Sequence, residues 1–221
     1  MELTHYGHSC VLLDAAGARL LFDPGAFSDG FESLRDLDAV LITHQHYDHI
    51  DAERLPALLA ANPEARLVVD PGTTTTVDKL DLPATTARPG DTLELGGVTV
   101  SVVGGEHAIV HPDIAVVPNV GYVVGDIAGT GAESGGETFY HPGDALHVPA
   151  RRVDVLGVPT AAPWLKAAEA VDFLRAVRPR LAVPIHEAVL ARPQGHIGLF
   201  TNLAPDGTEV RPAPHGETLA L

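Results

Sequence analysis

The stretch LITHQHYDHIDA, residues 41–52, holds the most informative cluster in the sequence. His44, His46, Asp48 and His49 fall within six positions, and nothing about folding requires such crowding. Imidazole nitrogens and carboxylate oxygens are the ligands that zinc, manganese and iron bind in proteins. The pattern H-x-H-x-D-H therefore predicts a metal site.

The residues around this cluster indicate how it is presented. LDAVLITH (37–44) is a continuous apolar run ending in polar residues, which is typical of a buried strand that delivers side chains into a site. Side chains alternate along an extended chain, so His44 and His46 are expected on one side. Asp48 and His49 follow where the chain turns, and we expect them to face a second ion.

Other apolar runs also end in residues that can bind metals. His107 ends SVVGGEH, Asp144 ends TFYHPGD, and His186 lies at the end of LAVPIHE. Together with the cluster they complete a set of seven expected ligands. His111 competes with His107, but it lacks the preceding Gly-Gly turn and is followed by Pro112, so we favour His107.

Composition limits the class of protein. The chain has 221 residues, 45% of them hydrophobic, and no linker marks a boundary, so we expect a single domain over residues 1–221. The formal net charge of -15 opposes binding to nucleic-acid phosphates and to anionic lipid surfaces. We therefore expect a small-molecule substrate, no nucleic acid and no membrane as partner; a homo-oligomer is compatible with the sequence.

The ends and the cysteine content predict the compartment. The N-terminus has the pattern of a strand and not of a signal peptide, and no stretch approaches the roughly 20 apolar residues of a membrane span. Cys10 is the single cysteine, so no intrachain disulfide forms, which favours a reducing compartment. These features predict a cytoplasmic protein.

Strands dominate the expected elements, with a few helices between them. We expect helices over 51–63, where Pro56 weakens the pattern, and over 163–179, and short strands and turns after Gly195. Sheets inside and helices outside are the simplest packing. The expected strands are a hairpin over 10–25 and the runs 37–44, 65–72, 91–107, 119–126, 137–144, 153–159 and 180–188.

The motifs H-x-H-x-D-H, GGEH, HPGD and PIHE, in that order, resemble those of the metallo-β-lactamase-fold hydrolases. GHSC (7–10) and FDPG (22–25) are similar to elements of a small single-domain subgroup that includes ascorbate-6-phosphate lactonase. The resemblance implies an α/β fold, specifically a four-layer αββα sandwich of mixed sheets with outer helices and a site at one edge of the two sheets.

The resemblance also implies how the ligands are shared between two divalent metal ions. We expect zinc, with manganese and iron as the alternatives. Asp48 is in addition the expected catalytic residue, because its carboxylate can orient a hydroxide by accepting a hydrogen bond. In this scheme the first ion takes His44, His46 and His107, the second takes Asp48, His49 and His186, and Asp144 bridges both.

Further residues are candidates for places behind the ligands or in the pocket. Asp23, in LLFDPG, is expected to bond to a ligand histidine, and a turn-forming role before proline is the alternative. His8 and His141 are candidate pocket residues, acting as acid or substrate contacts, with a hydrogen-bonded structural role as the alternative for His141. Trp164 could form a pocket wall, but we expect a core or surface aromatic.

These expectations describe a binuclear metal-dependent hydrolase in which a metal-held hydroxide attacks a small-molecule ester, lactone, amide or phosphodiester. The alternatives are an iron-dependent oxidoreductase on the same scaffold and a non-catalytic metal-binding module. Covalent serine catalysis is not supported, because no G-x-S-x-G elbow is present. The glycine-rich segment 129–137 fails as a phosphate loop, since no Lys-Ser/Thr pair follows it; we expect a flexible hairpin connection.

Overall fold

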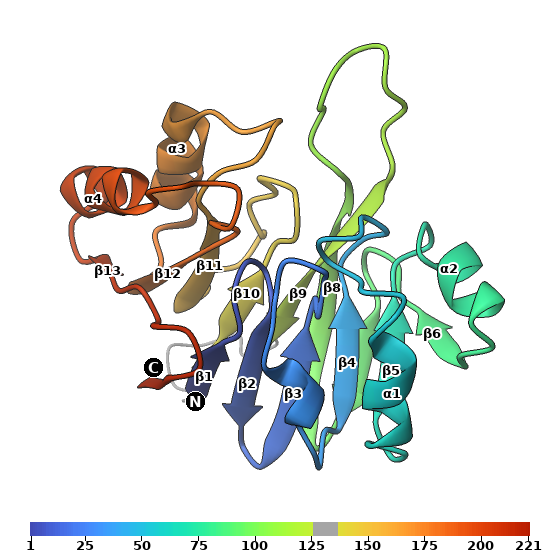
Figure 1. The fold of residues 1–221 in the computed structure, drawn as a ribbon. Coiled ribbons are helices and arrows are strands. Elements are labelled where there is room, and N and C mark those ends of the chain that lie inside the picture. The colour runs from blue at the N-terminus through green and yellow to red at the C-terminus, as the bar shows by residue number, and fades with distance from the viewer. Residues whose placement is uncertain (126–136) are drawn as a thin grey trace.

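Two mixed seven-stranded sheets pack face to face in the computed structural model, which describes residues 1–125 and 137–221 (Figure 1). Helices cover the outer face of each sheet. This is the αββα sandwich expected from the sequence. The glycine-rich segment 129–137 falls, except for its last residue, outside the described residues.

The first sheet comes from the N-terminal part of the chain and from its last strand. Its order is β14-β1-β2-β3-β4-β5-β6. Pairing is antiparallel from β14 to β3 and parallel from β3 to β6. The strands are β1 (Glu2–His5), β2 (Val11–Ala15), β3 (Ala18–Phe22), β4 (Ala39–Ile42), β5 (Arg66–Val69), β6 (Ala84–Thr86) and β14 (Thr218–Ala220).

The second sheet repeats this plan, with the order β13-β12-β11-β10-β9-β8-β7. Pairing is antiparallel from β7 to β10 and parallel from β10 to β13. Parallel strands end at the same edge of a sheet, so residues that follow them gather there. The strands are β7 (Thr92–Leu95), β8 (Val98–Glu106), β9 (Pro118–Val124), β10 (Phe139–His141), β11 (Val155–Pro159), β12 (Leu181–Ile185) and β13 (Glu209–Val210).

Alternation along the central strands explains the layers. In β4, Leu41 joins the core between the two sheets. Its neighbours Val40 and Ile42 point the other way and join a cluster on the outer face of the first sheet. Both faces of such strands are buried, which is why they appear in the sequence as continuous apolar runs. That outer cluster is covered by η1 (Phe31–Ser33), α1 (Leu55–Ala60) and α2 (Thr74–Lys79).

The helix expected over 51–63 is shorter than predicted. The Asp51 carboxylate accepts the backbone N–H groups of Glu53 and Arg54, both at 2.9 Å, in the turn that precedes α1. Pro56 lies in the first turn of α1, where its missing N–H would have had no partner in the helix. Helix α2 was not predicted, because its run of threonines is intrinsically poor at forming helices.

Two helices cover the second sheet. The expected helix over 163–179 is α3 (Ala167–Val177), which ends at Arg178 in the left-handed conformation. The short strands predicted after Gly195 are present as β13 and β14, but the prediction missed α4 (Gln194–Leu203), which precedes them. Two glycines lower the helix propensity of α4, and burial of Phe200 in the cluster beneath α3 stabilises it instead. Over the described residues, no helix is long and apolar enough to cross a bilayer.

Candidate metal centre

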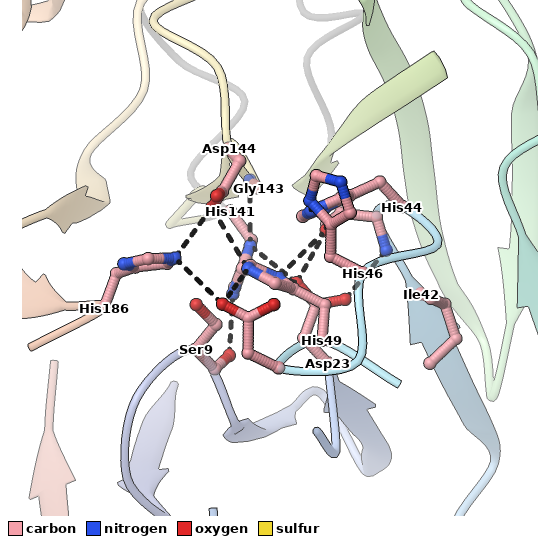
Figure 2. Close-up of polar contacts among 12 residues, drawn as sticks. Ser9, Asp23, Ile42, His44, His46, His49, His141, Gly143, Asp144 and His186 are labelled. Carbon is pink, nitrogen blue, oxygen red and sulfur yellow. Dashed lines mark hydrogen bonds and ion pairs between the residues drawn. The ribbon is translucent and has the colours of Figure 1, made fainter. Parts of the chain in front are cut away.

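All seven expected ligands lie at the edge of the sandwich where strands of both sheets end. Figure 2 labels five of them: His44, His46, His49, Asp144 and His186. The ligand loop follows β4, whereas His107 follows β8, Asp144 follows β10, and His186 follows β12. Gly104 and Gly105, the pair expected to turn the chain before His107, lie instead within β8, paired with Val120 and Asn119 of β9. The ligand atoms form two groups, each within 4.8 Å: His44, His46, His107 and Asp144 in the first, and His8, Asp48, His49 and His186 in the second.

Asp144 lies between the two groups. Its Oδ1 is 3.1 Å from Nε2 of His49 and 3.0 Å from Nε2 of His186, both in the second group. Its Oδ2 is 3.4 Å from Nε2 of His107 in the first group. The carboxylate therefore presents one oxygen to each group, which is the arrangement that a bridging ligand needs.

Hydrogen bonds fix the tautomer of three of these histidines. Nδ1 of His49 lies 2.7 Å from Oδ2 of Asp23, Nδ1 of His107 lies 2.6 Å from the Ala108 carbonyl, and Nδ1 of His186 lies 2.6 Å from the Ala161 carbonyl. Each partner only accepts, so each Nδ1 carries the hydrogen. The lone pair is left on Nε2, as a metal ligand requires.

The residues present fit a pair of metal ions. Nε2 of His49, His107 and His186 and Oδ1 of Asp144 are buried and have no hydrogen-bond partner among the described residues. Buried polar atoms without partners are costly, so native proteins rarely leave several together. His44 Nε2 and His46 Nδ1 also face each other at 2.9 Å. Convergent imidazole and carboxylate donors of this kind suit zinc, manganese or iron.

Asp23 organises the ligand loop from behind. Its carboxylate accepts the Thr43 backbone N–H and hydroxyl, both at 2.7 Å, as well as the ring hydrogen of His49. Because the Thr43 hydroxyl donates to Asp23, its oxygen can accept from Nδ1 of His44 at 3.1 Å. The contact expected between Asp23 and one of these histidines is thus present. Thr43 was missed, because a threonine at a strand end carries no distinctive sequence signal.

His8 lies in the second group, but both of its ring nitrogens already have hydrogen-bond partners, so it is not free to bind a metal. Its Nδ1 accepts the Ala188 backbone N–H at 3.3 Å, so the hydrogen resides on Nε2. That Nε2 lies 3.1 Å from Oδ2 of Asp48 and donates to it. The His8 ring also packs on that of His186, with centroids 3.8 Å apart. His8 therefore holds the Asp48 carboxylate in place from the protein side.

Two further candidates lie near the centre, and His141 has the hydrogen-bonded position that was its alternative role. His141 is fully buried, with Nε2 2.9 Å from the Ser9 carbonyl and Nδ1 accepting the Gly143 N–H, so it cannot contact substrate (Figure 2). Trp164 was expected in the core or on the surface, yet its indole N–H donates to Oδ2 of Asp144 at 2.9 Å. Trp164 lies in the turn before α3, where helical periodicity says nothing about its direction.

Strained and tightly packed backbone surrounds the centre. His8, Asp23 and His186 have φ values of 51°, 44° and 60°, a region that residues other than glycine rarely adopt. Gly25 packs directly on the ligand loop, where a Cβ would overlap the Asp48 carbonyl. This close approach explains why the FDPG motif ends in glycine. The strained backbone belongs to residues whose side chains point toward the centre.

Burial and neighbouring charges set the protonation of the expected ligands. Burial lowers the pKa of His44 well below its usual range, which favours the neutral ring that binds metals. Burial alone would raise the pKa of Asp144, but the adjacent His49 and His186 outweigh it and hold that pKa well below its usual range. Burial likewise opposes ionisation of Asp48, yet the hydrogen bond from His8 helps to lower its pKa to about 2.

Comparison with known proteins places this arrangement in a family. The model of the Beta-lactamase superfamily domain matches residues 2–186. The chain belongs to the beta-lactamase superfamily. Protein Rv0786c of Mycobacterium tuberculosis is 53% identical over 191 residues, which cover 86% of each chain. A UPF0173 metal-dependent hydrolase of Opitutus terrae is 31% identical, with 84% of each chain covered.

Solved structures of the superfamily share the fold. Igni18, a metallo hydrolase of Ignicoccus hospitalis, has a TM-score of 0.74 at 20% identity, and the match covers 99% of this chain and 97% of that one. The family and the fold class expected from the sequence are thus confirmed. At the level of class, the chain is a metal-dependent hydrolase of the metallo-β-lactamase superfamily.

Proposed function

We propose that this chain is a binuclear hydrolase that acts on a small-molecule ester, lactone, amide or phosphodiester. The observation that supports this most is the convergence of unpartnered ligand atoms of both groups around the Asp144 carboxylate. In the proposal His44, His46 and His107 hold one ion, and Asp48, His49 and His186 hold the other. Asp144 bridges them, and zinc is the first choice of metal.

Each chain residue has a defined task in this proposal. When bound, two divalent metals supply Lewis acidity and lower the pKa of water to about 7. Asp48 is held by His8 and reaches solvent, so its carboxylate can accept a hydrogen bond from the attacking water. Asp23 and the two backbone carbonyls behind the histidines keep the imidazoles aimed inward. Trp164 steadies Asp144 through its indole N–H.

The proposal is tested by metal analysis followed by an activity panel. Protein purified without added metal is analysed for zinc, manganese and iron, then loaded and assayed with p-nitrophenyl acetate, γ-butyrolactone, p-nitroacetanilide and bis-p-nitrophenyl phosphate. We expect two equivalents of metal and turnover of at least one substrate. His46→Ala and Asp144→Ala should each lower kcat/KM by a factor of about a hundred or more.

The matched control is His196→Ala on α4, which covers the outer face of the second sheet. It should retain both metals and full activity. A metal-loaded protein that is inactive on the whole panel would contradict the proposal, as would activity that survives both ligand substitutions. An iron-rich, coloured sample that reacts with oxygen would instead support the oxidoreductase alternative.

A further inference from the structure

The metal centre opens to solvent on one side. Most of the expected ligands are at most 5% exposed, whereas His46 and Asp48 are half-buried. Both half-buried ligands belong to the loop that follows β4, on either side of Tyr47. A substrate must therefore approach over this loop, and the side chains that flank it determine what can approach.

Apolar side chains flank this opening on both sides. On one side Phe27 packs edge-on against Tyr47, with centroids 5.3 Å apart, and its ring lies 5.2 Å from that of His8. On the other side Val110, Ile114 and Val116 line a hollow together with the ligands His46 and His107. We call these five residues the apolar rim: Phe27, Tyr47, Val110, Ile114 and Val116, which are 39%, 65%, 39%, 56% and 46% exposed.

The exposure of the five apolar rim residues indicates a binding surface. Single exposed apolar residues are ordinary, but several that adjoin one site indicate a binding surface. The segment between β8 and β9, which carries the aliphatic part of the rim, stands away from both sheets (Figure 1). None of the rim residues is a buried member of the hydrophobic clusters of the described chain. Their apolar surface is therefore available to a ligand.

The segments that carry the rim contain neither lysine nor arginine, and the nearby Arg54, which donates to the Gly25 carbonyl, is paired with Asp51 and Glu32. Residues 24–31, 44–53 and 107–117 include neither lysine nor arginine, whereas they include Asp29 and Asp113. The side chain of Asp113 is 90% exposed between the aliphatic rim residues, and its Oδ2 lies 3.6 Å from Nδ1 of His111. A phosphate or carboxylate on the substrate would therefore meet no lysine or arginine in these segments to offset its charge.

We infer that the substrate is an uncharged carboxylic ester, lactone or amide that carries an alkyl or aryl group, which packs against the apolar rim. This inference rests on the proposed hydrolase function and narrows it by setting phosphodiesters and phosphorylated lactones aside. In the reaction, the oxygen of water bonds to the acyl carbon while the bond to the alcohol oxygen or amine nitrogen breaks. The released alcohol oxygen or amine nitrogen takes up a proton; an ester or amide gives a carboxylic acid and an alcohol or amine, whereas a lactone gives a single hydroxy acid.

The inference is tested with two series of ligands on the zinc-loaded protein. The first consists of p-nitrophenyl butyrate, hexanoate and octanoate, with the p-nitrophenyl monoester of adipic acid as the charged match of the hexanoate. We expect kcat/KM to rise about two- to fourfold for each added methylene group. The adipic monoester should be hydrolysed at least tenfold less efficiently than the hexanoate.

The second series measures binding without turnover. Butyro-, hexano- and octanohydroxamate have a common metal-binding head, and their dissociation constants should fall with chain length by the same factor. The variant Ile114→Ser/Val116→Ser should weaken this dependence in both series while retaining both metals. Leu199→Ser/Leu203→Ser removes two exposed leucines from α4 and should leave it unchanged.

The outcomes separate the two proposals. Two results would overturn the substrate class but not the proposed hydrolase function. One is ester hydrolysis that does not depend on chain length in either series, and the other is equally efficient hydrolysis of the adipic monoester. The protein could instead hydrolyse none of the substrates and yet bind hydroxamates more tightly as their chains lengthen. That result would overturn the proposed hydrolase function and support the rim as an apolar binding surface. If the rim variant instead turns a dimer into a monomer and retains the chain-length dependence, the rim is an interface between two copies.

Discussion

At the scale of single residues, the centre depends on acceptors that hold the ring hydrogens of its histidines. Asp23 is the most connected of these, because it contacts His49 and both polar groups of Thr43. The sequence was enough to predict that the seven expected ligands and Asp23 lie together, because they stand in fixed motifs. It could not reveal Trp164 or the tautomer of His8, since both depend on neighbours that are distant along the chain.

Replacing Asp23 with asparagine should loosen the second metal. An asparagine side chain tolerates the left-handed backbone at this position but presents fewer acceptor sites, so His49 loses its orienting partner. We expect metal affinity to fall about 10- to 100-fold, measured by chelator competition. Asp172→Asn, on the exposed side of α3, is the control and should bind metal like the native chain. Unchanged affinity in Asp23→Asn would show that the Asp23–His49 contact does not tune the site.

At the scale of elements, strand ends place the expected ligands, and this much could be predicted from the apolar runs. The Gly-Gly turn expected before His107 is absent, because both glycines pair within β8. The helices were harder to predict. The threonines of α2 and the glycines of α4 disfavour a helix locally, and packing on a sheet overrides that preference. The sequence also could not show that the loop carrying Gly25 lies against the ligand loop, with Ala26 N–H donating to the Tyr47 carbonyl at 2.8 Å.

Gly25→Ala should therefore be severe. A methyl group at this position would overlap the Asp48 carbonyl and push the ligand loop away. We expect a loss of about 3 kcal/mol or more in the free energy of unfolding, measured by urea denaturation, and loss of metal. Gly198→Ala, in α4 with open space around it, should be neutral or stabilise by up to about 1 kcal/mol. Equal stabilities of the two variants would refute the close approach.

Phe200→Ala tests whether α4 is attached by its single fully buried side chain. The phenyl ring lies in the cluster that α3 and the second sheet form, so its removal should cost about 3–5 kcal/mol of unfolding free energy. Metal content of the protein that remains folded should be unchanged, because α4 contributes no expected ligand. A loss below about 1 kcal/mol in thermal or urea unfolding would mean that α4 is held elsewhere.

At the scale of the whole molecule, the two sheets share one core and meet at one candidate metal centre. The first sheet supplies the H-x-H-x-D-H loop, and the second supplies His107, Asp144 and His186. Bound metal would therefore connect the two sheets as well as serving chemistry. A ligand present at a thousand times its dissociation constant stabilises the folded state by about 4 kcal/mol.

Removing the metals should consequently lower the melting temperature by several degrees. We expect this shift in calorimetry when the metal-loaded protein is dialysed against a chelator, and re-addition of zinc should reverse it. In Asp144→Asn the chelator should have a much smaller effect, because the bridging charge is gone. Identical melting curves with and without metal in the native protein would show that the centre contributes nothing to stability.

The division of the ligands between the two sheets also has a consequence during synthesis. Ribosomes make the loop after β4 early and His186 late, so the H-x-H-x-D-H loop leaves the exit tunnel long before its partners exist. A nascent chain at this stage would hold an ion only weakly and would exchange it easily for another, because few of the donors are in place. With the proposed ligand set, tight binding of both ions would require β12 to have joined its sheet, so the metal would be selected only after both sheets have formed.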